Sequence, residues 1–171
     1  MEYESAKALF AAAGMPLYEQ QYCQLQAYLK TLAETNEKMN LTAITEPAEV
    51  WAKHFLDSAA LLCHAKLPTG ASCIDVGTGA GFPAMVLAVL RPDVQFTLLD
   101  SLQKRVRFLE QTAQLLGLGT CAASTPEPRR LPDSRSCGNS LTSPQHVQWQ
   151  RCRCWRNTAC RLCGWAACSP P

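Results

Sequence analysis

The chain has 171 residues, of which 47% are apolar and 18% are charged, and its formal net charge is +2. These values fit one compact domain and exclude a collagen-like chain and a chain that is disordered throughout. Because no apolar run is long enough to span a bilayer and the N-terminal residues Glu2 and Glu4 are acidic, we expect a cytoplasmic protein without a signal peptide.

Two amphipathic helices are predicted within the first 70 residues. Between Gln20 and Leu32, and again from Pro47 onward, apolar residues recur at spacings of three and four, which places them on one helical face. Proline suits a first helical position, so the second helix is predicted to begin at Pro47. The two faces consist of Leu25, Tyr28, Leu29 and Leu32, and of Trp51, Phe55, Ala59 and Leu62. Residues 67–70, Leu-Pro-Thr-Gly, form a turn that ends this helical part.

From residue 71 the pattern alternates between strands and helices. Residues 71–76 and 94–99 are short apolar runs with β-branched members, and each precedes an apolar helical segment, at 82–90 and at 102–116. The glycines at 117 and 119 end the second helix. This β-α-β-α order predicts an α/β fold with a parallel sheet. No further strand is expected after Gly119, so the fold is predicted to be truncated after the second strand-helix unit.

Residues 120–171 have a different composition from the rest of the chain. They hold 7 Lys and Arg against 2 Asp and Glu, whereas residues 1–119 hold 9 against 12, and they contain 7 of the 10 cysteines. Aliphatic side chains that could build a core are almost missing there, so this tail is predicted to be largely disordered.

Three explanations of the tail are open. A zinc site has enough thiolates, although the Cys152 and Cys154 pair is closer than usual zinc-binding spacings and no histidine follows. A disulfide framework is disfavoured because no export signal is expected. A shifted reading frame explains why Arg, Cys, Trp, Ser and Pro replace aliphatic residues, and it is the interpretation we favour. The cysteines of the zinc interpretation are Cys152, Cys154, Cys160, Cys163 and Cys168.

The segment with the clearest chemistry is Cys73-Ile-Asp-Val-Gly-Thr-Gly-Ala-Gly-Phe-Pro83, where a predicted strand turns into a helix. Gly77, Gly79 and Gly81 allow positive φ and a close approach of a ligand to the backbone. The spacing differs from the G-x-G-x-x-G of dinucleotide sites, and no G-K-[ST] follows for a triphosphate. A nucleotide-type ligand other than these is therefore predicted at the carboxyl end of the strand.

Two acidic residues narrow the choice of ligand. Asp75 precedes the loop and would repel phosphates, whereas it suits the sulfonium and ammonium groups of S-adenosylmethionine. Asp100 closes the next strand, where a carboxylate can bind two ribose hydroxyls. The alternative is structural: Asp75 is a turn residue, the glycines form a tight turn and Asp100 caps the following helix. No catalytic acid or base and no metal ligand is assigned.

The residues Asp75-Val-Gly-Thr-Gly-Ala-Gly-Phe-Pro83 and Leu98-Leu-Asp-Ser-Leu-Gln-Lys-Arg-Val-Arg-Phe-Leu109 resemble a known family. This family is the bacterial 16S ribosomal RNA guanine-N7 methyltransferases, also called the glucose-inhibited division protein B family. Asn40-Leu-Thr42 and His54-Phe-Leu-Asp-Ser58 match it in order and spacing. The resemblance extends from about residue 36 to Gly119 and stops there.

The resemblance implies a Rossmann-like, S-adenosylmethionine-dependent methyltransferase fold with N-terminal helices. Its parts would be a helical segment at 1–70, the start of the methyltransferase domain at 71–119 and the tail at 120–171. In the cofactor site, the backbone of Gly77 would lie close to the cofactor, Phe82 would make an apolar contact with it, and Asp100 would bind its ribose. Asp75, Gly79 and Gly81 would complete the site.

The resemblance also implies a substrate, namely guanine N7 in 16S ribosomal RNA, free or within the small ribosomal subunit. Lys104 and Arg105 either contact RNA phosphates or form a solvated helix face. His54 and Asp57 are expected to hold the loop by hydrogen bonds, a structural role that we favour over contact with the substrate. No membrane and no protein partner is predicted. Two other functions stay open, namely a truncated, inactive methyltransferase fragment and a small zinc-stabilised RNA-binding protein.

Overall fold

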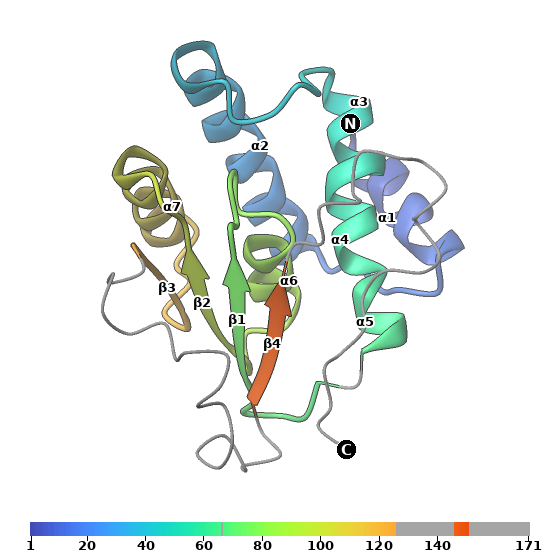
Figure 1. Cartoon of the computed structure of the whole chain (residues 1–171). Coiled ribbons are helices and arrows are strands. Elements are labelled where there is room, and N and C mark those ends of the chain that lie inside the picture. Colours follow the sequence, from blue (N-terminus) through green and yellow to red (C-terminus); the bar gives the residue numbers. More distant parts are fainter. Residues whose placement is uncertain (66, 126–145, 151–171) are drawn as a thin grey trace.

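A four-stranded sheet forms the centre of the computed structural model, which describes residues 1–65, 67–125 and 146–150 (Figure 1). The strands lie in the order β3-β2-β1-β4, and each neighbouring pair is parallel. Their bounds are Ser72–Val76 for β1, Gln95–Leu99 for β2, Cys121–Ser124 for β3 and His146–Gln150 for β4. The α/β class and the parallel sheet predicted from the sequence are therefore confirmed.

Two of these strands lie in the segment from which no strand was expected. β3 pairs with β2 from Phe96↔Cys121 to Leu99↔Ser124, and β4 pairs with β1 along its five residues. The expectation that no strand follows Gly119 is therefore wrong, because β3 and β4 both belong to the sheet. The physical reason is that backbone hydrogen bonds to a neighbouring strand define β3, although its sequence Cys-Ala-Ala-Ser has low strand propensity.

Most of the remaining tail, residues 126–145 and 151–171, lies outside the described residues. The predicted disorder there and the cysteines of the zinc interpretation fall in these ranges. Within the described part, no three His, Cys, Asp or Glu side chains gather into a group that could hold a metal. None of the helices described is long and apolar enough to cross a membrane.

The N-terminal helices α1 (Tyr3–Ala12) and α2 (Glu19–Met39) precede the sheet. Leu25, Tyr28 and Leu32 of α2 are buried, as the helical spacing predicted. Asn40 is the C-cap of α2, and its left-handed conformation with φ of 48° terminates the helix.

Four consecutive helical segments follow, from Pro47 to His64 (Figure 1). They are α3 (Pro47–Val50), the π-helical segment η1 (Trp51–Leu56), α4 (Asp57–Ala59) and α5 (Leu61–His64). The start at Pro47 is as predicted. Trp51, Phe55 and Ala59, from the predicted apolar face, are fully buried. The π-helical turn could not be read from the periodicity.

Helices α6 (Ala84–Leu90) and α7 (Gln103–Leu115) connect the strands and cover one face of the sheet. α6 packs against β2 and α2, and α7 packs against β3. On the covered face the strand side chains are buried, as Cys73 and Phe96 are, whereas alternate residues such as Ile74 and Thr97 are half-buried. This layering fixes the carboxyl ends of the strands relative to the loop after β1.

Candidate functional site

The loop of residues 77–83 leaves β1 at the carboxyl edge of the sheet and enters α6. Its first amide, Gly77 N, donates to Leu99 O at 2.7 Å, and Gly79 N donates to Asp100 Oδ2 at 3.0 Å. The backbone N of Asp100 in turn donates to Ser124 O at 3.3 Å. The structure therefore brings the glycines and Asp100 together at one edge, as the sequence predicted.

The glycines of this loop serve different purposes, although Gly77, Gly79 and Gly81 all have positive φ. At Gly77, with φ of 77°, no heavy atom of the described residues beyond its chain neighbours lies within 4 Å of the position that a Cβ would take, so this side of the loop is open toward the described part of the chain. At Gly81, a Cβ would lie 2.8 Å from the Tyr28 hydroxyl and 2.9 Å from Leu109 Cδ2. Gly77 therefore suits a close ligand approach, whereas Gly81 is required for internal packing.

Asp100 is a buried carboxylate that organises the loop. Its Oδ2 accepts from Gly79 N and, at 3.4 Å, from a guanidinium nitrogen of Arg105, and its Oδ1 accepts from Leu102 N at 2.9 Å. The donor Leu102 N is the amide of the N-cap residue of α7, and that helix has no side-chain capping bond from the described residues, so the structural alternative in which Asp100 caps it is wrong. A carboxylate accepts about four hydrogen bonds, and the described residues donate three, so they leave one position for a ligand hydroxyl.

Asp75 and Phe82 face the protein interior. Asp75 belongs to β1 rather than to a turn, and it is 2% exposed on the face of the sheet that the helices cover. The Phe82 ring is 3% exposed and packs between Tyr28, Phe55 and His54. In this arrangement the Phe82 ring supports the loop from the protein side, and its predicted apolar contact with a cofactor stays a prediction.

Tyr28 anchors the loop from α2, a role that the sequence analysis missed. Its hydroxyl donates to Ala80 O at 2.5 Å. Burial raises the pKa of Tyr28 well above its usual value, and the charges of Cys121 and Asp75 add to this. A tyrosine within an otherwise aliphatic helical face is the available signal, because a buried phenol needs a hydrogen-bond partner.

Alkaline pH is expected to destabilise the fold through Tyr28 and Cys121. Burial raises the pKa of Cys121 to about 12, with a further contribution from Asp75. Both groups are neutral when protonated, so their stabilisation is complete below the unfolded-state pKa values of about 9 and 10 and is lost as pH rises above them. We expect urea denaturation to show a loss of up to about 1.4 kcal/mol per pH unit for each group.

The matched controls for this pH dependence are Cys121→Ala and Tyr28→Phe. Each variant removes one titrating group and should flatten the decline in unfolding free energy above about pH 9. An unchanged slope in both variants would contradict the assignment.

The other predicted residues are placed as follows. Lys104 is exposed on α7, whereas Arg105 points to Asp100 and is already engaged there. His54 stacks on Phe82 and so contacts the loop through its ring. Asp57 is half-buried one helical turn further along. The predicted roles of Lys104 and Arg105 in RNA binding stay predictions.

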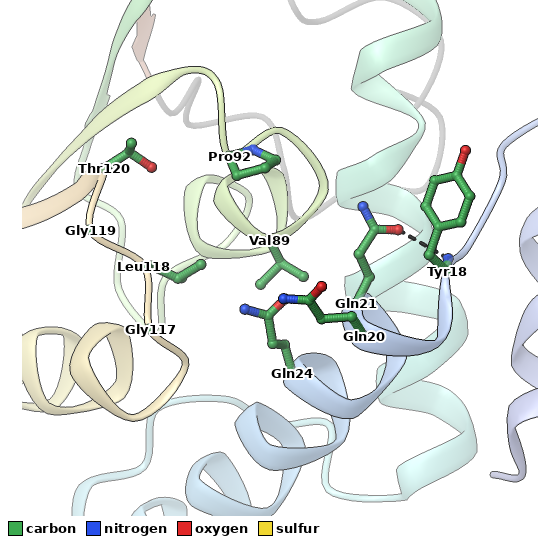
Figure 2. A pocket seen from close by; sticks show the side chains of 10 residues that line it. All are labelled: Tyr18, Gln20, Gln21, Gln24, Val89, Pro92, Gly117, Leu118, Gly119 and Thr120. Atoms are coloured by element: carbon green, nitrogen blue, oxygen red, sulfur yellow. Dashed lines mark hydrogen bonds between the residues drawn. The ribbon is translucent and has the colours of Figure 1, made fainter.

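A separate cavity of about 420 Å³ lies at the opposite, amino edge of the sheet (Figure 2). Pro92 precedes β2 and Gly117–Thr120 precede β3, and the facing wall comes from the start of α2. The carboxamides of Gln21 and Gln24 are already hydrogen-bonded to Leu90 O and Leu116 O. The cavity therefore lies where α2 packs against the sheet layer, and it is distinct from the loop site. Its lining residues are Tyr18, Gln20, Gln21, Gln24, Val89, Pro92, Gly117, Leu118, Gly119 and Thr120.

The amino-acid sequence of the chain is similar to those of known proteins. A relative from Bacillus cereus (strain AH187), ribosomal RNA small subunit methyltransferase G, is 44% identical over 122 residues, which are 71% of this chain and 51% of the relative. The protein of the same name from Alkaliphilus metalliredigens (strain QYMF) is 52% identical over 105 residues, which are 61% of this chain and 44% of the relative. The chain thus spans about half the length of the curated relatives it matches.

Among solved structures, a SAM dependent methyltransferase from Aquifex aeolicus is similar with a TM-score of 0.43 and 22% identity, over 58% of this chain and 50% of the other. The family model described as GidB, rRNA small subunit methyltransferase G, matches residues 21–124. This range includes all four motifs on which the resemblance was based and covers more than half of the chain. The chain belongs to the GidB family of rRNA small subunit methyltransferases G.

Proposed function

We propose that the protein is an S-adenosylmethionine-dependent methyltransferase that methylates N7 of a guanine in 16S ribosomal RNA. The observation that carries this proposal is the glycine loop at the carboxyl end of β1, open at Gly77 and tied to Asp100 at the end of β2. Family membership supports the reaction class and the ribosomal RNA substrate.

The residues of the loop fit the proposed cofactor. The absence of a Cβ at Gly77 leaves room for a ligand against the backbone. The Thr78 hydroxyl is fully buried, and no hydrogen-bond partner for it is found among the described residues, which suits a site that a ligand completes. The three donors that the described residues supply to Asp100 leave one acceptor position for a ribose hydroxyl. Gly77, Thr78 and Asp100 would therefore hold the cofactor.

The chemistry that these residues must support is modest. S-adenosylmethionine supplies an electrophilic methyl group on a sulfonium, and guanine N7 already has an in-plane lone pair. No proton has to leave before N7 attacks, so the protein mainly has to align the reacting atoms and exclude water. A loop that is fixed by Gly79, Ala80 and Phe82 provides a rigid support for such alignment.

We further propose that the RNA substrate approaches the same edge of the sheet. Lys104 and Arg107 are exposed on α7, which begins next to Asp100. Cationic side chains there can contact phosphates while Arg105 stays bound to Asp100. The partner would be 16S ribosomal RNA, free or in the small ribosomal subunit, in the cytoplasm.

Isothermal titration of the full chain with S-adenosylmethionine tests the proposal. We expect Gly77→Ala to weaken binding by at least about tenfold, because the new Cβ occupies the open side of the loop. Gly70→Ala is the matched control, since Gly70 has φ of 75° and is equally open with respect to the described residues, but lies at the other end of β1. It should leave the dissociation constant unchanged.

Two results would contradict the proposal. If the wild-type chain binds no S-adenosylmethionine, the alternative of an inactive fragment is favoured. If Gly70→Ala weakens binding as much as Gly77→Ala, the loop is not the site. Transfer of a labelled methyl group to 16S ribosomal RNA, followed by chemical cleavage at N7-methylated guanine, tests the proposed target atom.

A further inference from the structure

His54 and Phe82 form the closest of the ring contacts around the glycine loop. Their ring centroids are 4.4 Å apart and the ring planes differ by 17°, so the two rings are stacked. Phe82 belongs to the loop, whereas His54 belongs to η1, and both are buried. The stack is thus a direct contact between the N-terminal helices and the proposed cofactor loop.

Thr42 fixes the orientation of the His54 ring. Its Oγ1 lies 2.9 Å from His54 Nε2 and accepts a hydrogen bond from Ile44 N at 3.1 Å. With that oxygen already accepting, the hydroxyl hydrogen is available to donate to Nε2. A hydrogen bond at one ring nitrogen limits rotation of the imidazole and keeps its face toward Phe82.

Thr42 is itself held in place by the end of α2. Its backbone N donates to Asn36 Oδ1 at 2.8 Å, and Asn40 ends the helix in a left-handed conformation. The motif Asn40-Leu-Thr42 therefore places a hydroxyl at a defined point, at a distance from the loop. Nothing in the linear order of residues connects this motif with Phe82.

The segment that carries His54 is unusual in its own right. η1 (Trp51–Leu56) is a π-helical turn, a rare conformation that occurs often at functional sites. Phe55 from the same turn also contacts Phe82, with ring centroids 6.1 Å apart, and Tyr28 contacts it at 5.5 Å. The rings of Phe55 and Tyr28 are tilted to the Phe82 ring, whereas the His54 ring stacks on it. Phe82 is therefore enclosed by rings from α2 and η1.

We propose that His54 is a positioning residue, oriented by the Thr42 hydroxyl, that holds Phe82 and thereby fixes the loop of residues 77–83 in the conformation that receives the cofactor. This inference rests on the proposed function, because it assigns a purpose to the rigidity of that loop. It differs from a general packing role, since it predicts that the orienting hydroxyl matters as well as the ring.

Two matched pairs of variants of the full chain separate the effects of the His54 ring and of the Thr42 hydroxyl from those of side-chain volume. His54→Ala removes the stacking ring, and His54→Phe keeps one. Thr42→Val removes the hydroxyl at nearly constant volume, and Thr42→Ser keeps it. Amide hydrogen exchange is measured in a peptide covering 77–83, with a peptide covering β2 (Gln95–Leu99) as internal reference, and binding of S-adenosylmethionine is measured by titration calorimetry.

We expect His54→Ala to speed exchange at 77–83 by roughly tenfold relative to the β2 reference, and to weaken cofactor binding by a similar factor, because a stacked pair is lost. Thr42→Val should act in the same direction by about threefold to tenfold. His54→Phe should retain most of the loop protection, and Thr42→Ser should restore the wild-type values. If His54→Ala does not fold, the Thr42 pair decides.

The inference is overturned if Thr42→Val and Thr42→Ser give the same loop exchange, or if exchange rises equally at 77–83 and at β2. Loss of loop protection without any cofactor binding by the wild-type chain would contradict the proposed function while supporting the positioning role of His54. Cofactor binding that none of the variants alters would instead contradict the positioning role and leave the proposed function standing.

Discussion

Replacing Gly81 with alanine is expected to destabilise the protein by roughly 4 kcal/mol, a large part of the stability of a small domain. The added Cβ would lie 2.8 Å from the Tyr28 hydroxyl, 2.9 Å from Leu109 Cδ2 and 3.1 Å from Met85 Cβ. Met85 Cβ is fixed by its helix and cannot move away. The φ of 103° adds backbone strain for any residue with a Cβ.

The cost at Gly81 also has a structural consequence for the site. Relief of the contact with Tyr28 would require the hydroxyl to leave Ala80 O, which breaks the bond that anchors the loop. We therefore expect Gly81→Ala to lose cofactor binding together with stability. Urea denaturation measures the change in unfolding free energy, and titration with S-adenosylmethionine measures the binding.

Gly117→Ala is the control for backbone strain alone. Gly117 has φ of 69°, and among the described residues no heavy atom beyond its chain neighbours lies within 4 Å of its Cβ position, so this variant should lose only about 1 kcal/mol. The difference between the two variants contains the packing contribution at Gly81 together with the additional strain of its larger φ. Equal losses would mean that the contacts of α2 and α7 with the loop do not restrict position 81.

The sequence predicted the elements that have strong periodicity. The apolar stripe at Leu25, Tyr28 and Leu32 and the helix start at Pro47 are found where they were expected. The run of glycines after β1 also identified the loop correctly, because a sharp strand-to-helix turn with positive φ leaves few alternatives to glycine. Local rules were sufficient for these features.

Features that depend on distant parts of the chain could not be predicted. Gly81 cannot be told from Gly77 in the sequence, since only the approach of α2 and α7 to Gly81 distinguishes them. The sequence Cys121–Ser124 has no large aliphatic residue to indicate a strand, and its pairing with β2 decides its conformation. The stack of His54 on Phe82 likewise joins residues from two separate motifs.

Replacing Asp100 with alanine is expected to cost roughly 3 kcal/mol of stability and most of the affinity for S-adenosylmethionine. The change leaves the backbone amides of Gly79 and Leu102 and the guanidinium of Arg105 without their acceptor. Donors that lose a buried partner cost about 1 to 3 kcal/mol each, and relaxation toward water reduces the sum. The unfolding free energy and the cofactor dissociation constant are the measurements.

Asp100→Asn tests whether a side chain of the same shape but without the carboxylate charge is sufficient for stability. Both carboxylate oxygens of Asp100 accept hydrogen bonds, so the amide NH₂ of asparagine must face either the Leu102 donor or the donors from Gly79 and Arg105. We therefore expect a loss of about 2 kcal/mol even though the side chains have nearly the same size. A variant as stable as the wild type would show that these contacts contribute little.

Asp93→Ala is the matched control, because Asp93 is also paired with an arginine but is exposed to solvent. Both of its oxygens accept from Arg91 at 2.7 Å, and hydrogen bonding to that guanidinium lowers the pKa of Asp93. Exposed ion pairs contribute about 0 to 1 kcal/mol, so this variant should lose little stability and no cofactor affinity. Comparable losses from Asp93→Ala and Asp100→Ala would refute a special role of Asp100. A large loss for Asp100→Ala alone means that the hydrogen bonds of the buried carboxylate to Gly79, Leu102 and Arg105 hold the loop in its conformation.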